Sequence, residues 1–330
     1  MDSRRTLMLT AIVLLLAFGA APAGAHHPPK APEVKEIASF AAPGCTGGCG
    51  SGSTVGPDGA LYVTDPKAGR VLRVNPWTGA MSEFATGLPP STAGIGGAMD
   101  VAFLGHRAYV LTTMVGPDFG QPGAVSGIYR IDRGGSATPV ADIGTWSVEN
   151  PPATEFFIRT GVQYSMQEHR GGFLVADGHH NRVLWVSRHG DIRELIEFDN
   201  TVPTGLETFG PWVLVAEAGP IPHRPRDGRV HAFRPGQSEA IQIAAGAPLL
   251  TDVEFGPHGL YALSQGVWTL PPTPENEGQP ASANTGRLLR VHDGGFETVA
   301  ARLDRPTSVD FIGTSAFVVT LTGKVLRIRR

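Results

Sequence analysis

Short runs of alternating apolar and polar residues recur along the chain, and glycine-containing turns separate them. One recurring run follows such a turn and is centred on an apolar residue at Tyr62, Tyr109, Leu174, Leu214, Tyr261 and Phe317. These centres are 47, 65, 40, 47 and 56 residues apart. Alternation with a period of two is typical of half-buried antiparallel strands, and repetition at this spacing indicates a solenoid or a propeller.

Each repeat contains four runs of this kind. A short run precedes the turn, as in DVAF (100–103) and GVQY (161–164). The third run has almost the same sequence in distant repeats, GRVLRV at 69–74 and GKVLRI at 323–328. A fourth run follows another tight turn, as in MSEFAT (81–86). Six repeats of four strands predict an all-β fold, a six-bladed β-propeller with four-stranded antiparallel blades.

The last repeat ends after its third run, with no sequence left for a fourth. An unassigned strand-like run, VKEIASFAA (34–42), lies before the first repeat. Pairing between this run and 323–328 would complete the sixth blade and remove an exposed sheet edge. The sequence therefore predicts that the N-terminal strand closes the ring, and that residues 34–330 form one propeller domain.

Composition supports this interpretation and excludes one function class. The chain has 330 residues, with 43 Gly, 28 Pro, 17% charged residues and a net charge of −3. Abundant Gly and Pro fit many short strands joined by tight turns. No basic run is present, which argues against nucleic-acid binding.

The N-terminus predicts export. Arg4 and Arg5 precede an apolar stretch over 7–21, which is too short for a comfortable membrane span. The small residues at 23–25 form a cleavage site, so residues 1–25 are expected to be a signal peptide and 26–33 a Pro-rich leader. The route is either general secretion or twin-arginine export. We expect a secreted monomer without a transmembrane segment.

Two cysteines, Cys45 and Cys49, are the only ones in the chain. In an exported protein, pairing between them is the main expectation, since disulfides persist in oxidising compartments. A metal or redox role for the C-x₃-C spacing is the alternative.

The connections between strands differ in length on the two faces of the predicted ring. Turns between first and second strands, and between third and fourth strands, are short; SMQEHRGG (165–172) is the longer exception. The other connections share one face and include five long loops: 87–99, 112–125, 144–160, 218–227 and 264–285. We call this side the long-loop face. Long loops on a rigid scaffold commonly carry binding sites, so we expect a ligand here.

Asp100 and Asp252 begin innermost strands of blades two and five, so their carboxylates are expected at the channel mouth. They could bind Ca²⁺ or a cationic ligand, or perform acid–base chemistry. Because blades two and five stand opposite each other in a six-fold ring, a water-bridged ion or an organic cation fits better than a tight chelate. Hydrogen bonding to neighbouring backbone is the structural alternative.

Four further candidates lie at the ends of second strands or just beyond them, on the same face: Asp65, Asp177, His180 and Glu217. Their alternative role is to cap turns by accepting backbone N–H bonds. His179 and His180 are adjacent, but the sequence offers no third ligand beside them, so they are weak evidence for zinc.

Several segments together resemble the ScyD/ScyE family, which consists of exported six-bladed propellers related to NHL-repeat proteins. The similarity is carried by GPDGALYVTDPKAGRVLRVNP (56–76), GGFLVADGHHNRVLWVSRHGDI (171–192) and TDVEFGPHGLYAL (251–263), and by the closing GKVLRI. It spans essentially the whole mature chain. The resemblance implies the fold and export but supplies no biochemical activity.

Related six-bladed lactonases of the gluconolactonase type need a metal-binding Glu at an early blade, and Asn and Asp at later inner strands. The matching positions here are Ser51 and Ser53, then Thr204 and Thr251, with Asp252 one residue on. That ligand set is not preserved. The main functional expectation is therefore a binding module for a small molecule or an extracellular protein. A metal-dependent hydrolase or lactonase, or a lyase, with its site at the channel mouth is the alternative.

Overall fold

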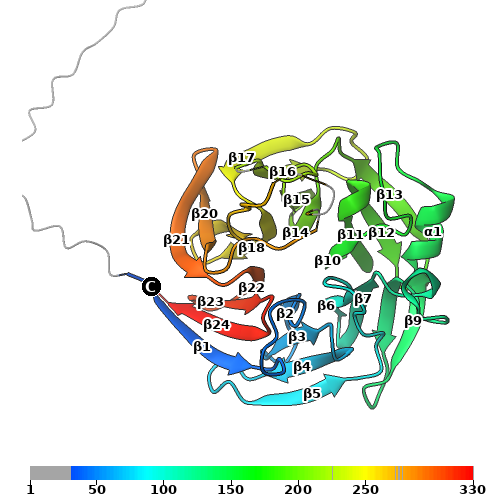
Figure 1. Cartoon of the computed structure of the whole chain (residues 1–330), viewed down its shortest axis with the longest axis horizontal. Coiled ribbons are helices and arrows are strands. Elements are labelled where there is room, and N and C mark those ends of the chain that lie inside the picture. The colour runs from blue at the N-terminus through cyan, green and yellow to red at the C-terminus, as the bar shows by residue number, and fades with distance from the viewer. Residues whose placement is uncertain (1–30, 225, 272, 274–275, 277, 330) are drawn as a thin grey trace, which may run out of the picture. The chain divides into compact units, whose positions relative to one another are not determined.

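The computed structural model describes residues 31–329, apart from residues 225, 272, 274, 275 and 277. Six four-stranded antiparallel sheets are arranged in a ring as the blades of a β-propeller (Figure 1). The predicted fold class is thus confirmed. The predicted signal peptide over 1–25 lies outside the described residues.

The first three blades use strands β2 to β13. Their bounds are β2 (Ser53–Val55), β3 (Leu61–Asp65), β4 (Arg70–Val74), β5 (Met81–Ala85), β6 (Gly97–Leu104), β7 (Arg107–Thr113), β8 (Gly127–Ile131), β9 (Ala137–Asp142), β10 (Gln163–His169), β11 (Gly172–Asp177), β12 (Arg182–Ser187) and β13 (Ile192–Glu197). The lowest-numbered strand of each blade, β2, β6 or β10, is the one nearest the ring centre.

The remaining blades use strands β14 to β24 and β1. Their bounds are β14 (Pro203–Phe209), β15 (Trp212–Glu217), β16 (Gly228–Phe233), β17 (Ile241–Ala247), β18 (Leu250–Gly256), β19 (Gly259–Ser264), β20 (Gly286–His292), β21 (Gly295–Leu303), β22 (Pro306–Ile312), β23 (Ser315–Thr320), β24 (Lys324–Arg329) and β1 (Glu33–Ser39). The inner strands here are β14, β18 and β22.

The hydrophobic core lies between neighbouring blades, because each sheet buries apolar side chains on both faces. The recurring apolar centres of the sequence all fall in second strands, where Phe317 and Leu174 are fully buried. Tyr109 of blade two packs against Phe173 of blade three, with ring centroids 4.8 Å apart. Apolar burial of this kind supplies the main stabilisation between blades.

The N-terminal strand β1 closes the ring. It pairs antiparallel with β24, from Glu33 opposite Arg329 to Ser39 opposite Lys324. The Nζ atom of Lys324 lies 2.8 Å from an Oε2 atom of Glu36 across this pair. Figure 1 shows β1 and β24, from the two ends of the propeller, side by side. The predicted closure is confirmed.

The third blade differs from its prediction. Its inner strand β10 covers 163–169 rather than 161–164, so most of SMQEHRGG is strand and not a long turn. His169 pairs directly with Gly172, which leaves a two-residue hairpin turn. Arg170 and Gly171 have φ values of 52° and 76°, as such a turn requires. The turn is therefore short, like its equivalents in other blades.

The loop over 144–160 contains the helix α1 (Ile143–Glu149). The Asp142 carboxylate caps it by accepting a hydrogen bond from the Thr145 backbone N–H at 2.8 Å. Short 3₁₀ turns, η1 (Pro117–Phe119) and η2 (Gly178–His180), occur in two other loops. Within the described part of the chain, no helix has the length and apolar character needed to cross a membrane.

Candidate functional site

A cavity of about 750 Å³ occupies the centre of the ring. Its walls come from the inner strands and from loops of the long-loop face. The lining includes residues from second-to-third-strand loops and from the connections between blades, for example Lys67, Ile95, His223 and Gln279. The cavity therefore opens on the long-loop face, where the sequence predicted a ligand.

Asp100 and Asp252 both line the cavity, from β6 and β18. Asp100 accepts hydrogen bonds from the backbone N–H groups of Val101 (2.8 Å) and of Met166 in the next blade (2.7 Å). Asp252 repeats the arrangement, with the N–H groups of Val253 at 2.9 Å and Val309 at 2.8 Å. The alternative role expected from the sequence, hydrogen bonding to neighbouring backbone, is therefore present. Both residues also line the cavity.

The sequence analysis missed two further acidic residues in the cavity lining, Glu254 and Asp310. Both occupy the same register position in their blades, opposite Tyr261 and Phe317 of the second strands. Glu207 takes this position in blade four and shares a side-chain hydrogen bond with Glu254. The signal was present in the sequence, because an acidic residue recurs at one position of three successive inner strands.

Burial raises the pKa of these carboxyl groups. Desolvation raises the pKa of Asp252 to about 7 and that of Asp310 to about 6. Desolvation also raises the pKa of Asp100 well above its usual range, and the nearby charges of Asp252 and Asp310 add to the rise. Glu254 has a raised pKa through desolvation and the adjacent charge of Glu207.

None of the four lining carboxyls forms an ion pair with a basic side chain among the described residues. The four groups are Asp100, Asp252, Glu254 and Asp310. Four carboxyls around one cavity cannot all ionise without mutual repulsion. A positive charge in the cavity would relieve that repulsion.

The positions that correspond to the lactonase ligands hold hydroxyl groups that tie blades together. Thr204 donates a hydrogen bond to the Leu250 carbonyl of the next blade at 2.9 Å. Ser53 donates to an Asp310 oxygen at 2.5 Å, joining the first blade to the sixth. Hydroxyls used in this way act as donors to neighbouring protein groups rather than as a metal-ligand set.

Asp65 and Asp177 lie outside the cavity lining among the described residues. Asp65 pairs with Arg70 at 2.9 Å and accepts the Ala68 backbone N–H at 3.2 Å. Asp177 and Arg182 are fully buried together, 3.0 Å apart. In both blades the Asp at the end of the second strand meets the Arg opposite it in the third strand.

His180 and Glu217 also lie outside the described cavity lining. A ring nitrogen of the buried His180 is 2.9 Å from the Ile158 carbonyl, and its other ring nitrogen faces Asp177 at 3.2 Å. Glu217 contacts His231 at 2.8 Å. These contacts hold loops and neighbouring strands, and a binding role for the two side chains stays a prediction.

The described residues form no preformed calcium-binding site. No three His, Cys, Asp or Glu side chains come together there in a way that could hold a metal ion. Asp100 and Asp252 each direct their two oxygens at backbone N–H groups, which leaves little free ligand capacity. Calcium between these carboxylates stays a prediction.

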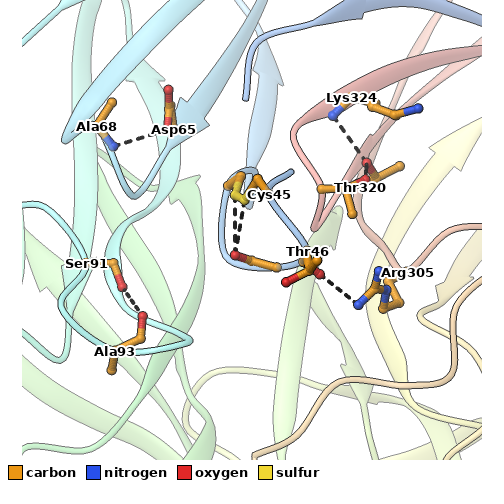
Figure 2. Close-up of a disulfide and its surroundings, with 12 residues drawn as sticks. Cys45, Thr46, Asp65, Ala68, Ser91, Ala93, Arg305, Thr320 and Lys324 are labelled. Carbon is orange, nitrogen blue, oxygen red and sulfur yellow. Dashed lines mark hydrogen bonds between the residues drawn. A yellow bond between two sulfur atoms is a disulfide. The ribbon is translucent and has the colours of Figure 1, made fainter. Parts of the chain in front are cut away.

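The disulfide between Cys45 and Cys49 is confirmed, and no cysteine in the described chain is free. Figure 2 shows its loop, in which Arg305 donates a hydrogen bond to the Thr46 carbonyl at 2.8 Å. Thr46, Gly47 and Arg305 all line the cavity. The disulfide loop is therefore part of the cavity rim.

Comparisons with known proteins agree on the fold. No protein-family model matches the chain, and no curated protein matches its sequence. A virginiamycin B lyase from Staphylococcus aureus is 15% identical, with a TM-score of 0.54 over 91% of this chain and 99% of the lyase. A PQQ-bound aldose sugar dehydrogenase from Streptomyces coelicolor is 13% identical, with a TM-score of 0.59 over 92% and 99%.

A gluconolactonase from Xanthomonas campestris is also 13% identical, with a TM-score of 0.55 over 86% of this chain and 87% of the gluconolactonase. These three proteins have different names and chemistries on a common architecture, and none is close in sequence. Fold likeness at this level does not carry function. The chain is similar to them as a six-bladed β-propeller.

Proposed function

We propose that the chain is an exported binding module that takes a small organic cation into its central cavity through the long-loop face. The observation that carries the proposal is the set of four cavity-lining carboxyls, which have no basic partner among the described residues. Export rests on the N-terminal sequence pattern and fits the Cys45–Cys49 disulfide.

The size of the cavity favours a small molecule over a protein segment. Its volume of about 750 Å³ lies within the range of roughly 300–1,000 Å³ for small-molecule sites. The lining contains apolar side chains, among them Met166, Leu206 and Phe311, as well as the carboxyls. A ligand with an apolar body and a cationic group would match both kinds of surface.

The charge of the lining favours a cation. Asp252 and Asp310, with pKa values of about 7 and about 6, become ionised around neutral pH. An opposite charge close to a buried carboxylate favours its ionised form, so ligand and carboxylates stabilise each other. The contacts of Asp100 and Asp252 to backbone keep these carboxyls in place before a ligand arrives, which lowers the cost of ordering them.

The test compares choline with 3,3-dimethyl-1-butanol, its uncharged counterpart of nearly the same shape. We expect calorimetry to show choline binding with one site per chain and at least tenfold weaker binding of the alcohol. Spermidine serves as a second cationic probe. The proposal fails if neither cation binds, or if the neutral alcohol binds as tightly as choline.

A matched pair of variants tests the location. Asp100→Asn with Asp252→Asn removes two cavity charges, whereas Asp118→Asn with Asp199→Asn removes two exposed charges elsewhere. The two double variants have the same formal net charge. We expect only the cavity pair to weaken choline binding by tenfold or more, while equal effects would point to a general influence of net charge.

A further inference from the structure

Two basic residues line the cavity at its entrance, away from the carboxyls of the inner strands. Lys67 belongs to the loop between β3 and β4, and Arg305 directly precedes the inner strand β22. Both residues line the cavity, and both lie in connections that emerge on the long-loop face. Asp252 and Asp310 lie instead within inner strands. The cavity lining therefore carries positive groups at its rim and carboxyls further inside.

The two basic side chains lie beside the same short loop, residues 45–49, which the disulfide closes. Arg305 donates a hydrogen bond from Nη1 to the Thr46 carbonyl at 2.8 Å (Figure 2). Further along the loop, a Cβ atom added to Gly48 would lie 3.8 Å from Cε of Lys67. Thr46 and Gly48 also line the cavity. Lys67 and Arg305 are thus brought to one side of the entrance, with the disulfide loop between them.

Protein groups neutralise the charge at the rim only in part. Lys67 forms no ion pair with any described residue, and Arg305 pairs only with the neighbouring Asp304, at 2.9 Å from its Nε atom. The Nη2 atom of Arg305 makes no hydrogen bond to a described residue. Lysine and arginine are the side chains that most often bind carboxylates and phosphates. An anionic group at the rim would use these N–H donors.

The strand geometry sets the distance between the two kinds of charge. Arg305 precedes β22, and Asp310 is the fifth residue of that strand. At about 3.3 Å per residue, their backbone positions are roughly 16 Å apart along the strand. Asp252 is the third residue of β18, which corresponds to Ser308 in β22, so it lies roughly 10 Å along the strand from the level of Arg305. A ligand that reaches both regions must therefore be elongated.

We propose that the ligand of the central cavity is an elongated zwitterion, with its cationic group among the carboxyls of the inner strands and an anionic group at Lys67 and Arg305. This ligand class rests on the proposed cation binding, which it makes more specific. Opposite charges at the two ends fix the orientation of the ligand, because the reversed orientation would place like charges together. Apolar lining residues such as Met166 and Leu206 suit a hydrocarbon chain between the two charged groups.

The test compares 6-(trimethylammonio)hexanoate with its primary amide. The two molecules share the cationic group and the chain length, and they differ in the negative charge at the other end. We expect calorimetry on the parent protein to show at least fivefold tighter binding of the hexanoate. Glycine betaine and its amide form the matched short pair. Betaine cannot reach both regions, so it should bind no tighter than its amide.

Variants of the basic residues locate the anionic group. Lys67→Met removes a charge from the rim, whereas Lys35→Met removes an exposed charge on β1, outside the described cavity lining. We expect the preference for the hexanoate over its amide to fall at least threefold in Lys67→Met and to persist in Lys35→Met. Arg305→Gln should reduce the preference as well. Because Lys67 is exposed, its substitution tests the charge without removing a buried contact.

Two outcomes would overturn the zwitterion. One is equal binding of the hexanoate and its amide to the parent protein. The other is an undiminished preference for the hexanoate in both Lys67→Met and Arg305→Gln. Choline binding to the parent protein distinguishes this failure from a failure of the cation proposal. If choline binds and the hexanoate has no advantage, only the zwitterion is rejected; if choline, the hexanoate and the amide all fail to bind, cation binding is rejected too.

Discussion

The carboxylate of Asp252 on the inner strand of blade five accepts a hydrogen bond from the backbone N–H of Val309 on blade six, at 2.8 Å. Asp100 does the same toward Met166 across the ring, between blades two and three, at 2.7 Å. Each carboxyl thus joins two blades and also lines the cavity. Fold stability and cavity charge therefore depend on the same atoms.

This dual role predicts a large stability loss in Asp252→Ala. The substitution leaves the buried N–H groups of Val253 and Val309 without an acceptor, at about 1–3 kcal/mol each. We expect the free energy of unfolding in urea to fall by about 2–4 kcal/mol. Asp199→Ala, at an exposed position, should change it by less than about 0.5 kcal/mol. Similar losses in both variants would contradict the conclusion that the Asp252 carboxyl stabilises the fold by joining two blades.

The raised pKa of Asp252 predicts a pH dependence with a definite sign. Its folded-state pKa of about 7 exceeds the ordinary value of 3.8, so the folded protein binds more protons than the unfolded chain between these values. This contribution to stability is complete below about pH 4 and is lost as the pH rises through 7. His179 and His223, whose pKa values are lowered to about 4, act in the opposite direction below pH 6.5.

The measurement of stability against pH must therefore separate the effect of the Asp252 carboxyl from the effects of the histidines. Asp252→Asn keeps the size of the side chain and stays neutral at every pH, so it is compared with the parent protein between pH 5 and pH 8. Without choline, the parent should lose stability relative to the variant by on the order of 2 kcal/mol across this interval. A difference that is constant with pH would show that Asp252 does not titrate there.

The propeller fold could be predicted from the sequence because each repeat is a short, nearly continuous segment of the chain. Strand alternation, turn glycines and the missing fourth strand of the last blade together predicted six blades and the pairing of β1 with β24. The inner strand of blade three was misplaced because Arg170 takes a positive φ that sequence rarely signals outside Gly and Asn. Local turn chemistry, rather than blade order, limited the prediction.

The candidate site could be predicted from the sequence only in part, and for a different reason. Asp100 and Asp252 could be assigned because they begin aligned strands, and both do line the cavity. His223 was not singled out as a cavity residue, because it lies in the loop after β15, and the conformation of that loop follows no repeating pattern. Loops without a repeating pattern carry little information about which side chains meet.

The closing strand predicts a truncation phenotype. Removal of residues 26–42 exposes the edge of β24 and deletes its pairing from Glu33 to Ser39. A loss of about 3 kcal/mol would lower the melting temperature by roughly 6–12 °C, and we also expect concentration-dependent association. Removal of 26–31 alone retains β1 and is the control. A truncated protein that stays monomeric with an unchanged melting temperature would contradict ring closure by this strand.

The disulfide predicts a local effect on the cavity rim. The Cys45–Cys49 loop is short, so Cys45→Ser with Cys49→Ser should cost no more than about 2 kcal/mol of global stability. Thr46 and Gly47 line the cavity. We therefore expect the double variant to show a clear loss of choline affinity and a smaller change in melting temperature. Intact mass before and after reduction checks the bond itself, and two free thiols in protein from an oxidising compartment would refute it.

The most direct test of cation binding locates the ligand in a crystal. Arsenocholine has the shape and charge of choline and carries an anomalous scatterer, so a soaked crystal reports the position of the cationic group. We predict one strong arsenic peak inside the central cavity, beside the carboxyls of Asp252 and Asp310, which disappears in the Asp100→Asn, Asp252→Asn double variant. Arsenic peaks confined to the outer surface, or an unchanged cavity peak in the double variant, would contradict the claim that these carboxyls bind an organic cation.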